Sequence, residues 1–157
     1  MSERFDFNFG YTYIDASITE SFEFVQGDPT TVITDGNRLP GAAEHEGFVA
    51  ANYRVPMGGS ELVLHADVSY HGDTLSNFRD IPTVPAMSFA ELESFTLVNA
   101  AVTWDAGKYR VSLFGDNLGN ERGETQVTTA SFYGDRDQGW GVIRPRTIGI
   151  RFTFGYD

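Results

Sequence analysis

The feature that most constrains this chain is a strict two-residue alternation of apolar and polar side chains near its C-terminal end. In residues 147–156, large apolar side chains occupy every second position, namely Ile148, Ile150, Phe152, Phe154 and Tyr156. Neighbouring side chains of a β-strand point to opposite faces, so this pattern predicts a strand with one apolar and one polar face. Such a strand either buries its apolar face against a second layer or turns that face to lipid in a membrane barrel.

The same alternation recurs along the whole chain. It predicts strands over residues 4–14, 45–55, 61–71, 95–104 and 109–118, and a final strand over residues 142–156. The first of these carries an aromatic residue at every second position from Phe5 to Tyr13. The sequence therefore predicts an all-β fold, an antiparallel up-and-down meander of about six strands.

The connections between these strands alternate between long and short. Residues 15–44, 72–94 and 119–139 form long polar stretches, whereas residues 56–60 and 105–108 form short turns. Antiparallel strands alternate in direction, so all long loops fall on one rim of the sheet and all short turns on the other. This asymmetry is typical of outer-membrane barrels.

Aromatic residues gather near both ends of the predicted apolar face. One set lies near the short turns and another near the long loops: Phe5, Tyr53, Trp104 and Tyr109 in the first, Tyr11, Tyr13 and Tyr70 in the second. Aromatic rings favour the interface between membrane and water. The pattern predicts two aromatic girdles around a lipid-facing wall; a soluble sandwich with aromatic residues near its strand ends remains the alternative.

Composition excludes several classes of protein. The net charge of −11 disfavours binding of nucleic acid through a basic patch, and the absence of cysteine excludes disulfides and thiolate metal sites. No run of roughly 20 apolar residues predicts a spanning helix. Residues 1–4 lack the apolar segment of a signal peptide. The chain is therefore either soluble or a piece of an exported protein whose start lies elsewhere.

Several short segments, taken in order, resemble the C-terminal part of a TonB-dependent outer-membrane receptor. They are Gly-Asn-Arg-Leu-Pro at 36–40, His45, Ala-Asn-Tyr-Arg at 51–54, Leu-Val-Asn-Ala at 97–100, Tyr-Arg-Val-Ser-Leu-Phe at 109–114, Asp-Asn-Leu at 116–118 and Pro-Arg-Thr-Ile-Gly at 145–149. The resemblance implies a bacterial outer-membrane barrel of about 22 strands, closed by an N-terminal plug domain. It also implies uptake of a scarce nutrient, of the siderophore, cobalamin or glycan class, driven by the TonB complex.

The resemblance implies that residues 1–157 are the C-terminal segment of such a barrel, without the plug domain and the N-terminal strands. The six strands would then form an incomplete arc of a transmembrane β-barrel. The last strand resembles the signal read by the barrel assembly machinery. Its candidate residues are Thr147, Gly149, Phe152 and Phe154, with Tyr156 as an alternative terminus. Gly119 departs from the family, which usually has a large residue there.

The polar faces of the strands contain no recognisable catalytic arrangement. The Gly-x-Ser-x-Gly motif is absent, and His65 and His71 would lie about 20 Å apart along a strand, too far to share a metal ion. We therefore expect no enzyme activity, metal or cofactor. The residues predicted to face the lumen are Arg54, His65, Asp67, Arg110 and Arg151. The arginines suit either anionic ligands or carboxylates of a plug.

The sequence thus favours part of a nutrient receptor whose partners are outer-membrane lipid, the rest of the barrel with its plug, the TonB complex and the assembly machinery. The alternative is a soluble or secreted β-sheet protein that binds a ligand or partner.

Overall fold

The computed structural model describes residues 4–78, 89–130 and 137–155, and its main element is a six-stranded antiparallel sheet. The strands are β1 (Phe5–Tyr13), β4 (His45–Met57), β5 (Ser60–His71), β8 (Phe95–Asp105), β9 (Tyr109–Asp116) and β12 (Thr147–Phe154). They pair in the order β1-β4-β5-β8-β9-β12, which is also their order along the chain. The predicted meander is confirmed, as is the all-β class.

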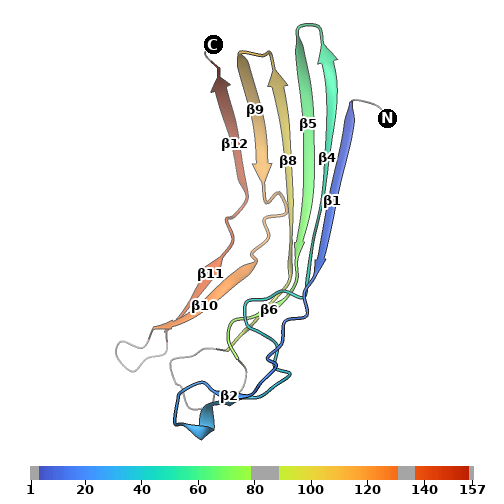
Figure 1. Ribbon diagram of the computed structural model, residues 1–157. Coiled ribbons are helices and arrows are strands. Elements are labelled where there is room, and N and C mark those ends of the chain that lie inside the picture. Colours follow the sequence, from blue (N-terminus) through green and yellow to red (C-terminus); the bar gives the residue numbers. More distant parts are fainter. Residues whose placement is uncertain (1–3, 79–88, 131–136, 156–157) are drawn as a thin grey trace.

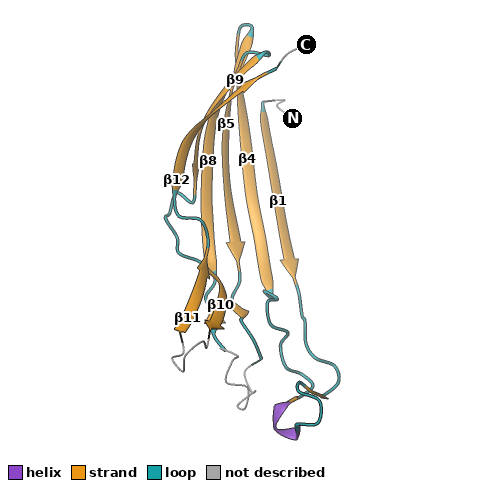
Figure 2. Cartoon of the chain, turned by 90° about the vertical axis from the view of Figure 1, so that its left-hand side faces the viewer, coloured by secondary structure: helices purple, strands orange, loops and turns teal. Residues whose placement is uncertain are grey.

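The sheet is an open arc. Strands β1 and β12 form its two edges and do not pair with each other (Figures 1 and 2). Figure 1 shows the short turns at one end of the strands and the long connections at the other. The left-handed turn residues Gly58 and Gly107 have φ of +68° and +76°, where glycine avoids steric strain. The architecture is therefore an incomplete barrel arc, as the sequence predicts.

The strand register divides the side chains into two faces. One row across all six strands is wholly apolar: Phe5, Tyr53, Leu64, Val102, Leu113 and Ile150. We call the side of the sheet that carries Leu64 the outer face and the side that carries Asp67 the inner face. In the central strands β5 and β8, most outer side chains are exposed, whereas the inner ones are half-buried. Side chains on the concave side of a curved sheet shield one another, so we assign the inner face to the concave side.

No layer of the described chain covers the outer face. Ile150 remains 74% exposed and Phe9 75% exposed, although both are large apolar residues. The buried apolar residues among those described are Ile33, Ala43 and Leu92, which lie in the long connections instead of beneath the sheet. The hydrophobic surface of the sheet is therefore far larger than a water-soluble domain normally exposes.

The long connections contain small elements of their own. In the first, β2 (Phe22–Glu23) pairs with β3 (Val32–Ile33), and a 3-10 helix (Pro29–Thr31) lies between them. In the second, β6 (Thr74–Leu75) pairs with β7 (Glu91–Leu92). Asp28 caps the short helix, and its hydrogen bonds from Thr30 lower the pKa of its carboxyl group.

The third connection differs from the sequence prediction. The final strand, predicted over residues 142–156, begins five residues later than expected: β12 covers Thr147–Phe154, and Val142 ends the preceding strand β11 (Asp137–Val142). Strand β11 pairs with β10 (Glu124–Ala130) in a hairpin beyond the end of the sheet (Figure 1). Pro145 has no backbone N–H to donate to a sheet ladder, and β12 begins two residues after it. Within the described residues, no helix is long and apolar enough to cross a membrane.

Candidate functional site on the inner face

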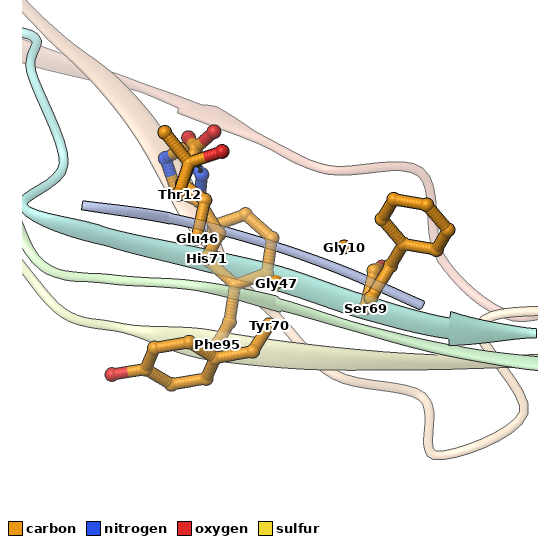
Figure 3. Close-up of a pocket in the computed structure, with 9 residues that line it drawn as sticks. Gly10, Thr12, Glu46, Gly47, Ser69, Tyr70, His71 and Phe95 are labelled. Atoms are coloured by element: carbon orange, nitrogen blue, oxygen red, sulfur yellow. Dashed lines mark ion pairs between the residues drawn. The ribbon is translucent and has the colours of Figure 1, made fainter. Parts of the chain in front are cut away.

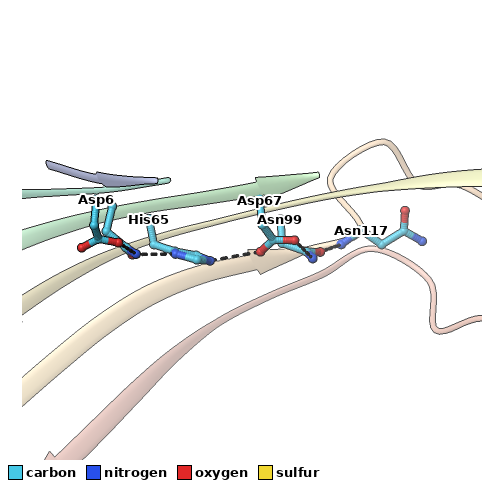
Figure 4. Close-up of polar contacts among 6 residues, drawn as sticks. Asp6, His65, Asp67, Asn99 and Asn117 are labelled. Carbon is cyan, nitrogen blue, oxygen red and sulfur yellow. Dashed lines mark hydrogen bonds and ion pairs between the residues drawn. The ribbon is translucent and has the colours of Figure 1, made fainter. Parts of the chain in front are cut away.

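A chain of polar side chains crosses the inner face from the edge strand β1 to the connection after β9 (Figure 4). Asn52 donates through Nδ2 to the Asp6 carboxylate at 2.7 Å, and its Oδ1 lies 2.7 Å from Nδ1 of His65. The other ring nitrogen of His65 lies 3.0 Å from Oδ1 of Asp67. Asn99 donates to the second oxygen of Asp67 at 2.8 Å. Four strands are thus joined by side chains as well as by backbone hydrogen bonds.

The chain of contacts ends on Asn117, which joins the sheet to the third connection. Its backbone N–H donates to Oδ1 of Asn99 at 2.8 Å. Its side-chain amide donates to the carbonyls of Glu121 and Arg144, and its Oδ1 accepts from the Glu121 N–H. Asn117 is buried and has a φ of +50°, a left-handed conformation that asparagine tolerates better than most residues. One buried side chain therefore ties both ends of the β10–β11 segment to the sheet.

The predicted lumen residues all lie on the inner face, although the structure does not bring them into one site. Arg54 pairs with Asp6 at 2.7 Å, and Arg110 donates through Nε to Asp105 at 2.8 Å. The Arg151 guanidinium lies 5.2 Å from the ring centre of Phe114, within the range of a cation–π contact. Two of the three arginines are already neutralised by carboxylates of this chain, so they offer little free charge to an anionic ligand.

A hollow of about 380 Å³ lies on the inner face near the long connections (Figure 3). The register explains its lining, because two neighbouring rows of inner side chains meet there. The first row contains Thr12, Glu46, His71 and Phe95. The second row contains Gly10, Phe48, Ser69 and Leu97. All of these except Leu97 line the hollow, together with Gly47 and Tyr70. Nδ1 of His71 pairs with Glu46 at 2.7 Å across the first row.

The aromatic rings of the inner face lie over glycines of the two edge strands. A side chain on Gly10 would come within 2.4 Å of the Phe48 ring, and one on Gly149 within 2.6 Å of the Phe114 ring. Each ring thus covers the backbone of an edge strand that lacks a side chain at that point. Among the residues of the predicted assembly signal, Gly149 has a structural reason to be glycine. Thr147 shares its face, Phe152 and Phe154 lie on the outer face, and Tyr156 falls outside the described residues.

The residues of the predicted girdles all lie exposed on the outer face, and they follow a diagonal across the sheet. Tyr109 faces Phe154 near the short turns, Trp104 lies one row further along, and Tyr53 with Phe5 lies one row beyond that. At the other end, Tyr11 and Tyr70 share one row, and Tyr13 lies one row further toward the long connections. The diagonal is therefore clear at the end with the short turns. Tilted strands with a register stagger, as in a barrel, produce this displacement. The membrane position of these rings stays a prediction.

A separate contact ties the first long connection to the second. Arg38 donates through Nη1 to the Asp73 carboxylate at 2.7 Å and through Nη2 to the Ala42 carbonyl at 3.1 Å. The hydrogen bond from Arg38 lowers the pKa of Asp73. The Arg38 Nε atom is buried and has no hydrogen-bond partner within the described part of the chain, where the Glu44 carboxylate lies 3.7 Å away. Arg38 therefore joins the two connections at the end of the barrel arc that holds the hollow.

Sequence reasoning found His65 and Asp67 but missed the amides that link them, Asn52, Asn99 and Asn117. It also missed Phe48, which stands half exposed on the inner face. A signal was available in the alternation itself, since Phe48, Phe95 and Phe114 occupy positions of the polar face where an aromatic residue is unexpected. The asparagines give no such signal, because their roles depend on which residues lie opposite them.

Comparison with known proteins supports this geometry. The family described as TonB dependent receptor-like, beta-barrel matches residues 2–118 of the 157. The chain belongs to this family. No curated protein and no solved structure matches it. Family membership implies a bacterial outer-membrane context with a barrel-and-plug arrangement, and TonB-dependent receptors are transporters rather than enzymes. The matched segment contains β1 to β9, and therefore the whole polar chain as far as Asn117.

Proposed function

We propose that this chain forms the C-terminal arc of the barrel of a TonB-dependent receptor that imports a scarce nutrient across the outer membrane. The observation that carries the proposal is the uncovered outer face, which presents one apolar row across all six strands. Lipid is the environment in which such a face needs no second protein layer. The same face argues against a soluble or secreted ligand-binding protein, which would have to cover it.

In this proposal the inner face lines the lumen and meets a plug domain. The remaining strands pair with the edges that β1 and β12 leave open, because an unpaired edge within a bilayer leaves backbone N–H and C=O groups unsatisfied. The long connections lie on the extracellular side and the short turns in the periplasm. Energy for transport comes from the TonB complex through a segment outside this chain, and the barrel assembly machinery reads β12.

The proposal is tested by substitution of Phe152 and Phe154 with alanine in the receptor that carries this segment. Both rings lie exposed on the outer face of β12. Each loses roughly 1.5–3 kcal/mol of apolar burial in lipid, and the pair also lies in the predicted assembly signal. We expect less receptor in the outer membrane, measured as the heat-modifiable band of washed membranes on gels.

Thr153→Ala provides the matched control, because Thr153 lies between the two rings on the opposite face. It should leave insertion unchanged. The 157-residue chain by itself should aggregate in water, since nothing described covers its apolar face. A monomeric chain that melts cooperatively in buffer without detergent would refute the proposal.

A further inference from the structure

The hollow between the Thr12 row and the Phe48 row combines two aromatic rings with unused polar groups. Its volume of about 380 Å³ lies within the range of small-molecule sites. Phe48 stands 49% exposed on the polar face, in a position that Gly10 leaves open. Phe95 lies on the other side, with its ring centre 5.1 Å from that of His71. The exposed Phe48 ring on this wall provides a flat surface against which another ring can stack. The Phe95 ring is half-buried and packs against Gly123 and His71.

The polar groups of the hollow are available to a ligand. Within the described part of the chain, the hydroxyl groups of Thr12 and Ser69 make no hydrogen bond to protein. Glu46 uses Oε1 for its contact with His71, and no contact of its second oxygen is present among the described residues. Hydroxyls donate and accept, whereas a carboxylate accepts only. The wall thus offers several acceptors and a few donors to a partner that carries hydroxyl groups.

The charge of the hollow restricts the ligand further. Of the described residues that line it, none is lysine or arginine, and Glu46 carries the one fixed charge. A neighbouring hollow shares Phe95 and is lined by four glutamates and one arginine, namely Glu91, Glu93, Glu121, Glu124 and Arg122. These glutamates would repel a ligand that carries several negative charges. Among the described residues that line the first hollow, no arginine is present to bind its carboxylate or phosphate groups.

We propose that this hollow is a subsite for a neutral polyhydroxylated ring, such as a sugar unit of a glycan. A C–H face of such a ring stacks against Phe48, Phe95 forms the apolar wall on the other side, and the hydroxyls in the ring plane bond to Thr12, Ser69 and Glu46. The inference rests on the proposed function and gives its substrate class. The hollow lies beside the tether of Arg38 and Asp73, at the end of the arc through which an extracellular ligand enters.

The test uses the complete receptor, extracted from outer membranes in detergent after heat-modifiable mobility has shown that it is inserted. Failure at that first step refutes the proposed function. Binding is then measured on an array of neutral and uronic-acid glycans and by calorimetry with maltotriose, chitotriose, trigalacturonate and a ferric tris-catecholate. We expect binding to neutral glycans, and no binding to the ferric tris-catecholate. Selective binding of the anionic probes, or of no probe, overturns the inference while receptor insertion stands.

Variants separate stacking from charge. Phe48→Leu keeps most of the apolar volume but removes the exposed ring, and should weaken binding of the best neutral glycan roughly two- to tenfold. Thr12→Val removes one hydroxyl partner and should weaken it roughly two- to tenfold. Glu46→Gln keeps a hydrogen-bonding group without charge and should change affinity for a neutral glycan less than threefold; a larger loss would point to a cationic ligand and overturn the neutral assignment.

Thr153→Ala again serves as the control, because Thr153 lies on the inner face at the far end of the sheet. The receptor with Thr153→Ala should bind the glycan with the same affinity as the unchanged receptor. The Phe48→Tyr receptor keeps an aromatic face and should bind the glycan nearly as well as the unchanged receptor. Equal weakening by Thr153→Ala, or no effect of Phe48→Leu in a receptor with normal mobility, would contradict the assignment.

Discussion

The two faces of strand β5 are built from alternate residues of the same twelve-residue segment, yet they are held in different ways. On the outer face, Leu64, Val68 and Tyr70 are exposed. On the inner face, His65, Asp67 and His71 each contact a named partner within 3.0 Å. The comparison teaches that the outer face is specified by polarity and approximate size, whereas the inner face is specified by which side chains lie opposite one another.

The largest effect should follow from a charge on the outer face. Ile150 lies in the apolar row that includes Leu64, and Arg at this position would place a charge in the middle of the proposed lipid-facing band. We expect Ile150→Arg to lower the free energy of unfolding of the receptor in lipid by about 2–4 kcal/mol. Urea titration of the inserted receptor measures the loss. Arg151→Ala, one residue further and on the inner face, should cost much less; equal costs would remove the distinction between the faces.

The next effect concerns a contact that polarity alone does not predict. Gly149→Val introduces a side chain into the space of the Phe114 ring, with Cβ within 2.6 Å of a ring atom. We expect a destabilisation of about 1–3 kcal/mol, typical of overpacking. The double variant Gly149→Val, Phe114→Ala should regain part of the lost stability in the same measurement, since the ring has been removed. Gly155→Ala meets no atom within 4 Å and provides the matched control.

A smaller effect should follow from loss of one link in the polar chain. Asn99→Ala leaves one oxygen of Asp67 and the N–H of Asn117 without their partner. Because the site is half-buried and water can replace part of the contact, we expect a loss of about 1 kcal/mol. Hydrogen exchange of the Asn117 and Glu121 amides should accelerate more than that of β5. Asn8→Ala lies on the same face with no side-chain partner among the described residues, and should change neither quantity.

The smallest effect should be the pH dependence of the tether between the long connections. The hydrogen bond from Arg38 lowers the pKa of Asp73, so the folded group holds its charge at a lower pH than the unfolded one. The contribution to stability is therefore fully present above the ordinary aspartate pKa of about 3.9, and it is lost as the pH falls through the lower folded value. Protease cleavage in residues 36–42 should increase below about pH 4. In Asp73→Asn, cleavage should be independent of pH in that range; unchanged dependence would assign the effect to another group.

The sequence by itself determined the strands and their faces. Five of the six predicted strands lie within three residues of the observed bounds, and the aromatic alternation of β1 correctly predicted an apolar face that nothing described covers. Side-chain period and turn composition are local properties, so they can be recognised before any pairing is known. The open meander followed from the order of long and short connections.

Only the tertiary structure decided which inner side chains meet. Asn99 reaches Asp67 because β8 pairs with β5 in one register, and Asn117 reaches Arg144 across 27 positions of sequence. The late start of the last strand likewise depended on its neighbour, because Thr147 pairs with Asp116, the last residue of β9. Alternation shows which face of the sheet a residue occupies. Which residues of the next strand lie opposite it depends on register and stagger, and no local sequence pattern contains these.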